Sequence, residues 1–172
     1  MATGIFVYQS FISESKMWAV YTIPKAFMVY SITSIVTLFL SGFLVDKFTG
    51  RKLILFMNIP LLVAMFVLFQ FNHEVFAYIF LGFIGISNGL ANILGSSTWA
   101  EIYGVKYIGS IKALTTAFMV FSTAFGTAVF GLLIDNGFTI ENIAFVGGTY
   151  IVISLILLIF FRKTIEPVKL TN

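Results

Sequence analysis

The chain has 172 residues, of which 59% are hydrophobic and only 10% are charged, and its mean hydropathy is +1.03. Because a soluble domain carries about 25% charged residues, so apolar a chain cannot cover its surface in water, and we expect an integral membrane protein. The net charge of +3 comes from bases spread between apolar segments, which argues against a nucleic-acid partner, and the absence of cysteine excludes disulfides and thiolate metal sites.

The apolar segments predict one short helix and five membrane-spanning helices. Residues 1–12 are too few to cross a bilayer, because a spanning helix needs about 20 apolar residues, and the polar residues 13–16 end this segment. We interpret it as the outer half of a helix that begins upstream, and we expect the chain to be a fragment. The five longer segments are 19–45, 53–71, 75–99, 113–134 and 144–161.

The distribution of lysine and arginine predicts the orientation in the membrane. If successive loops alternate between the two sides, one side carries all but two of the ten bases, the exceptions being Lys16 and Lys25. Bases concentrate in the cytoplasmic loops of membrane proteins. We therefore expect the loop at 42–52, the loop at 100–112 and the tail at 162–172 to be cytoplasmic.

The loop after the first full span carries a recognisable order of residues, Gly-x-x-x-Asp-Lys-x-x-x-Arg-Lys. It resembles the signature loop of the major facilitator superfamily (MFS) of transporters, which occurs once in each six-helix half. Thr49, with Gly50 beside it, departs from the family pattern, which usually has glycine at that point. The signature residues are Gly42, Asp46, Lys47, Arg51 and Lys52. Further stretches similar to a bacterial branch of the family are 99–104, 109–112, 117–126 and 131–135.

The end of the chain decides which half it resembles. Arg162 and Lys163 are followed by a short polar tail, where a first half would continue into a long basic linker. The resemblance is thus to the C-terminal half, helices seven to twelve. It implies an all-α membrane protein, half of an MFS-type helical bundle, with five full transmembrane helices and one truncated helix.

The resemblance also implies a function, partners and a location. The chain is expected to work by alternating access in the transport of a small organic solute, together with a missing N-terminal six-helix half. The chain would lie in the lipid bilayer of a bacterial cytoplasmic membrane. The resemblance to a bacterial branch of the family favours a carboxylate as the solute. No cofactor is implied. A rival interpretation is a small stand-alone membrane protein that serves as a structural or accessory subunit.

The family pattern implies a cytoplasmic gate made of Asp46, Arg51 and Glu101. Asp46 ends one span, Arg51 opens the next and Glu101 follows the third full span, all on the same membrane face. Arginine suits this role because its planar guanidinium can pair with two carboxylates, which lysine cannot do. The alternative is that these charges only anchor the loop and set the topology.

Two amides predict a polar face on the third full span. Asn88 and Asn92 are four residues apart and so share one face of a helix. They are equally compatible with a solute cavity and with packing between helices, since Gly85-x-x-x-Gly89 is a close-packing pattern. Tyr8 and Gln9 are candidates for the same cavity.

No charged side chain occurs between residues 26 and 45 or within the other four apolar segments. A proton-coupled carrier generally needs an intramembrane acid or histidine as its relay, so we expect no relay in this part of the transporter. The sequence has no metal motif, no catalytic triad and no phosphate-binding loop, and we expect neither a metal site nor an enzyme.

Overall fold

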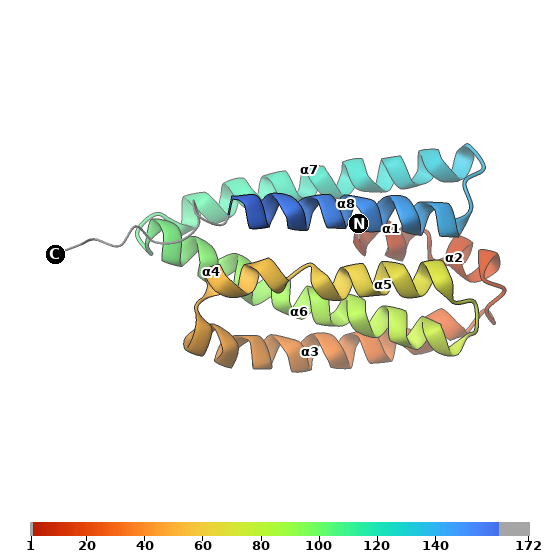
Figure 1. The fold of residues 1–172 in the computed structure, drawn as a ribbon, viewed down its shortest axis with the longest axis horizontal. Helices are drawn as coiled ribbons and strands as arrows, with labels where there is room; N and C mark the ends of the chain where they lie inside the picture. Colours follow the sequence, from red (N-terminus) through yellow and green to blue (C-terminus); the bar gives the residue numbers. More distant parts are fainter. Residues whose placement is uncertain (1, 162–172) are drawn as a thin grey trace.

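The computed structural model describes residues 2–161, and every regular element in that range is a helix. Two short helices, α1 (Ala2–Val7) and α2 (Gln9–Ser15), come first and are separated at Tyr8. The long helices α3 (Thr22–Phe48), α6 (Val75–Tyr103), α7 (Ile108–Asp135) and α8 (Ile140–Phe160) run lengthwise along the molecule, with α6 oblique to the others (Figure 1). The remaining span is made of α4 (Gly50–Leu53), the 3₁₀ turn η1 (Ile54–Phe56) and α5 (Ile59–Gln70).

Five helical stretches are long and apolar enough to cross a membrane, with α4, η1 and α5 together forming the second of them. The prediction of an all-α membrane protein with five full spans is therefore confirmed. Such a protein is helical for a physical reason. Lipid offers no hydrogen-bond partners, so the backbone must satisfy its own N–H and C=O groups within each span.

Helix α6 lies at the centre of the packing. Half of the residues in its most apolar stretch are buried, against 6% in the corresponding stretches of α3 and α7. Helix α3 packs along one side of α6, and α5 packs against both α6 and α8. The buried core follows this arrangement, with Phe80 and Ile84 of α6 among its largest fully buried side chains. The mostly exposed apolar faces of α3 and α7 are left for lipid or for other helices.

Two glycines of α6 allow its close approach to α3. A Cβ atom at Gly85 would lie 2.5 Å from the carbonyl oxygen of Tyr30, and one at Gly89 would lie 2.7 Å from that of Ser34. No larger residue fits at either position without moving a helix backbone. The hydroxyl of Thr33 adds a hydrogen bond of 3.1 Å to the carbonyl of Gly82 across the same interface.

The helix bounds differ from those predicted by the apolar runs. The segment predicted at 1–12 is two helices that extend to Ser15. The span predicted at 75–99 continues to Tyr103, and those predicted at 113–134 and 144–161 begin earlier, at Ile108 and Ile140. A helix does not end where its side chains cease to be apolar, because its backbone bonds can continue into the headgroup region. The span predicted at 19–45 is shifted to Thr22–Phe48, and the one predicted at 53–71 begins at Gly50. The predicted tail at 162–172 lies outside the described residues.

Candidate functional site

The turn between α3 and α4 places the signature loop against the last turn of α6. Helix α3 ends at Phe48, and Thr49 adopts φ +69° and ψ 145°, a conformation that favours glycine. This is the position where the family usually has glycine, so the turn keeps a glycine-like backbone although its residue is threonine. The chain then enters α4 at Gly50, directly beside Glu101. We call this end of the bundle the Glu101 end.

Glu101 caps the first turn of α4 from a neighbouring helix. Its Oε1 accepts a hydrogen bond of 2.6 Å from the backbone N–H of Gly50, and its Oε2 accepts one of 3.2 Å from that of Arg51. The first N–H groups of any helix lack partners within the helix. A carboxylate is a strong acceptor for them, so Glu101 joins the loop to α6 through the backbone as well as through side chains.

Arg51 also contacts Glu101 through its guanidinium group. Its Nη2 donates to the backbone carbonyl of Glu101, and its Nε lies 3.9 Å from the Oε2 of the same residue. Both side chains are largely sheltered, with 17% of Arg51 and 29% of Glu101 exposed. Asp46 has an exposed side chain, and within residues 2–161 the structure gives it no hydrogen bond or ion pair. The structure thus brings together two of the three predicted gate residues.

The other signature residues have different surroundings. Lys47 and Lys52 are exposed, and the Nζ atom of Lys47 lies 5.4 Å from the ring centroid of Phe48. A Cβ atom at Gly42 would meet nothing within 4 Å. At Gly50 it would lie 2.5 Å from the Oγ of Ser97. The glycine that the packing requires is therefore Gly50, which the sequence motif identified only as the neighbour of Thr49.

The two amides of α6 lie in different environments. Asn88 is half-buried, and its Nδ2 donates a hydrogen bond of 3.3 Å to the Oγ of Ser34 in α3. Asn92 is exposed, and its Nδ2 donates to the backbone carbonyl of Asn88 at 2.9 Å. Ser96, one turn further, donates to the carbonyl of Asn92 at 3.4 Å. Asn88 therefore contributes to the α3–α6 interface, whereas Asn92 is exposed and Ser96 is half-buried.

Tyr8 and Gln9 pack in two other places. The ring of Tyr8 stacks on Phe130 of α7, with centroids 5.2 Å apart and an angle of 7° between the planes. Gln9 lines a small apolar hollow whose walls include Phe27 and Phe80. Among the described residues, no hydrogen bond links either side chain to Asn88 or Asn92. A shared cavity of all four residues stays a prediction.

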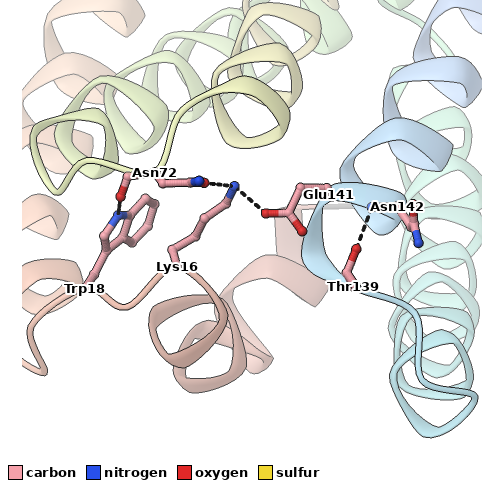
Figure 2. Close-up of polar contacts among 6 residues, drawn as sticks. All are labelled: Lys16, Trp18, Asn72, Thr139, Glu141 and Asn142. Carbon is pink, nitrogen blue, oxygen red and sulfur yellow. Dashed lines mark hydrogen bonds and ion pairs between the residues drawn. The ribbon is translucent and has the colours of Figure 1, made fainter.

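The opposite end of the bundle has a polar cluster that the sequence did not predict. Figure 2 shows Lys16, at the end of α2, between Asn72 and Glu141. Its Nζ donates to the Oδ1 of Asn72 at 2.6 Å and lies 2.7 Å from the Oε1 of Glu141. The side chain of Lys16 is fully buried, whereas 38% of the Glu141 side chain is exposed. We call these three residues the Lys16 clasp.

Further hydrogen bonds lie beside the Lys16 clasp, at the same end of the bundle. The indole Nε1 of Trp18 donates to the backbone carbonyl of Asn72 at 2.5 Å (Figure 2), and Glu74 accepts from the backbone N–H of Ala19 at 3.0 Å. Thr139 caps α8 by accepting from the N–H of Asn142. The only sequence signal for this cluster was a lysine at the end of an apolar segment, and its partners are far away in the sequence.

The comparisons with known proteins agree with the loop and the fold. The family model of the Major Facilitator Superfamily matches residues 1–172. Comparison with curated proteins and comparison with solved structures gave no match. The signature loop, the five apolar spans and a family match over residues 1–172 confirm the predicted resemblance to the family, whereas the assignment to its C-terminal half stays a prediction. The chain belongs to the Major Facilitator Superfamily, and it is a membrane transport protein.

Proposed function

We propose that this chain is the C-terminal half-bundle, helices seven to twelve, of a carrier that moves a small organic solute by alternating access. In this mechanism two half-bundles rock about a site near the middle of the membrane. The observation that carries the proposal is the attachment of the signature loop to α6, through Gly50, Arg51 and Glu101. These contacts fit a gate and also an anchor that only holds the loop, and the transport assay described below separates the two.

The Glu101 end is proposed to face the cytoplasm of a bacterial cell. It carries Lys47 and Lys52 of the signature loop, Lys106 between α6 and α7, and Lys112 near the start of α7. The opposite end has Lys16, whose charge is paired with Glu141, and Lys25. This asymmetry supports a cytoplasmic Glu101 end, because translocation disfavours loops rich in bases.

Asp46 is proposed to complete the gate when the two half-bundles close. It lies two residues before the end of α3, and its carboxylate is exposed rather than engaged with the described part of this bundle. A carboxylate in that position is available to a helix of the N-terminal half, whose free N–H groups attract negative charge. Arg51 and Glu101 would hold the loop in place while that contact forms and breaks.

The face of α6 around the exposed Asn92 is the proposed wall of the solute path. Asn92 and Ser96 present polar groups there, and Asn88 stands at its border with α3. Amides and hydroxyls can bind a polar solute while leaving the membrane interior free of charge. The branch of the family that the sequence resembles supports a carboxylate as the solute, with Tyr8 and Gln9 as further candidates for contact.

Uptake by the complete transporter tests the proposal. Radiolabelled small carboxylates, polyols and amines would be offered to cells that express this chain together with its N-terminal half-bundle. We expect saturable uptake of one class, and we expect Arg51→Ala to abolish it at unchanged membrane abundance. Lys52→Ala is the matched control, because it removes the adjacent, exposed base, and it should transport normally. Wild-type uptake by Arg51→Ala would contradict the gate, and no saturable uptake of any solute would contradict the carrier.

A further inference from the structure

The span formed by Gly50–Gln70 is one apolar run but not one continuous helix. It consists of α4, η1 and α5, and Met57 and Asn58 form a turn between η1 and α5. The N–H of Met57 bonds to the carbonyl of Ile54 at 3.3 Å, a three-residue step instead of the usual four. Pro60 has no N–H to donate to the carbonyl of Phe56, and its ring disfavours a regular helix there.

Helix α6 supplies a partner at this break. The hydroxyl of Ser87, a buried residue of α6, donates to the backbone carbonyl of Met57 at 3.4 Å. An unpaired carbonyl inside a membrane protein is costly, and breaks persist where a neighbouring side chain satisfies the freed groups. The break is therefore built into the packing of two helices.

The two sides of the break are held by different forces. Helix α5 is held by apolar packing, with Ala64, Met65, Val67 and Leu68 buried against α6 and α8. On the other side, Gly50 is the only buried residue of α4, and η1 has none. The hydrogen bonds and the ion pair to Glu101 attach Gly50 and Arg51 to α6, and η1 contacts α6 and α8 without any buried residue of its own.

The far end of α5 is fixed as well. Asn72, two residues beyond it, receives hydrogen bonds from Lys16 on its side chain and from Trp18 on its backbone (Figure 2). Both donors come from the segment between α2 and α3. The span is therefore held by hydrogen bonds at both ends. Between these ends, α5 is packed against its neighbours, and the helix is interrupted at Met57 and Asn58.

We propose that α4 and η1 form a lever that turns about Met57–Pro60, with Glu101 as its latch, while α5 stays packed on α8. The signature loop is joined directly to Gly50, so it would move with the lever. This inference goes beyond the proposed gate, because it states which part of the bundle moves and where the motion stops. It depends neither on the solute nor on the N-terminal half.

Hydrogen exchange of backbone amides tests the lever in the full 172-residue chain, purified in lipid nanodiscs. Glu101→Ala is expected to speed exchange in peptides covering 50–58 by about tenfold or more, because hydrogen bonds to a charged group each contribute roughly one such factor. Exchange in 61–70 should not change. Glu101→Gln keeps one acceptor oxygen and should lie between Glu101→Ala and the wild type.

Two further variants make the test decisive. Glu74→Ala is the matched control, since it removes a carboxylate that accepts a backbone hydrogen bond at the other end of the bundle, and it should leave 50–58 unchanged. Pro60→Ala restores the missing N–H and should slow exchange at 54–58 in an otherwise wild-type chain. Equal acceleration of 50–58 and 61–70 in Glu101→Ala would overturn the lever. If Glu101→Ala does not fold, an unchanged rate at 54–58 in Pro60→Ala would overturn it instead.

Discussion

Gly50 is the residue whose packing at the Glu101 end tolerates a side chain least. A Cβ atom there would lie 2.5 Å from the Oγ of Ser97 and 3.0 Å from the Oγ1 of Thr98. Both hydroxyls are buried and have no hydrogen-bond partner within the described residues. An added methyl group would push α4 away from α6 and lengthen the hydrogen bond from Gly50 to Glu101.

Gly50→Ala is therefore expected to lower the free energy of unfolding by about 1–3 kcal/mol, the usual cost of overpacking. Gly42→Ala is the matched control. It lies within α3 with open space around it, so alanine should be neutral or stabilising by about 0.5–1 kcal/mol. Thermal unfolding followed by circular dichroism in detergent measures both. A lower midpoint for Gly42→Ala than for Gly50→Ala would contradict the packing that we describe.

The Lys16 clasp at the opposite end predicts unequal effects of removing its two charges. Lys16 is fully buried, whereas Glu141 is more than one-third exposed. Without Glu141, a buried ammonium group keeps only Asn72 as its partner. Without Lys16, the carboxylate can turn toward water. Breaking a buried pair is costly chiefly because of the charge left behind.

We expect Glu141→Leu to destabilise the chain by about 3 kcal/mol and Lys16→Met by about 1 kcal/mol, the smaller figure reflecting the exposure of Glu141. The double variant should be closer to Lys16→Met than to the sum of the two changes, since contacting residues are not additive. Unfolding midpoints of the three variants measure this. Equal losses in the two single variants would show that the burial of Lys16 does not matter.

The residues of the signature loop could be predicted because the family has a local motif there. The residues from Gly42 to Lys52 are contiguous, so their order can be recognised without knowing the fold. Glu101 is 50 residues from Arg51, and only the family pattern linked the two before the structure did. The Lys16 clasp has no such pattern, and its members are 56 and 125 residues from Lys16. Buried ion pairs between distant segments leave no local trace in a sequence.

At the scale of elements, the number of spans could be predicted because each needs a fixed length of apolar residues. The break in the Gly50–Gln70 span was not predicted, although Pro60 is a local signal. Its position near the start of α5 makes it compatible with a helix beginning as well as with a kink, and hydropathy does not distinguish these. The helix ends were also missed, because hydropathy locates the apolar core and not the last hydrogen bond.

The two amides of α6 make an element-scale prediction that separates packing from solute path. Asn88 donates to Ser34 and is half-buried, while Asn92 is exposed. In the complete transporter, cysteine at 92 should react faster with a membrane-impermeant thiol reagent than cysteine at 88, because position 92 is exposed and position 88 is half-buried. Cysteine in place of the exposed, apolar Ile156 of α8 is the control for a lipid-facing position.

The absence of native cysteine makes this labelling specific to the introduced residue. Reaction at 92 that is no faster than at 156 would mean that Asn92 faces lipid. The amides of α6 would then line no solute path, and the Gly85-x-x-x-Gly89 face would serve only the packing between helices.

At the scale of the whole molecule, the chain presents little buried surface on α3 and α7. Large apolar side chains such as Phe39, Phe43, Phe118, Phe121 and Phe125 are exposed. In a bilayer, lipid covers such faces at no cost, and in a two-half carrier part of them would meet the second bundle. If the chain is the proposed half-bundle, it forms only one wall of a path through the membrane, and the proposed site needs a partner.

Reconstitution of this chain in liposomes, alone and with the proposed N-terminal half-bundle, tests whether transport needs two half-bundles. Uptake of the solute found in the cell assay would be measured over a range of concentrations for both preparations, at equal amounts of inserted protein. We predict no saturable uptake by the chain alone and saturable uptake by the two halves together. Saturable uptake by the chain alone would contradict the need for a second half-bundle, and no uptake by the two halves together would contradict the proposed carrier.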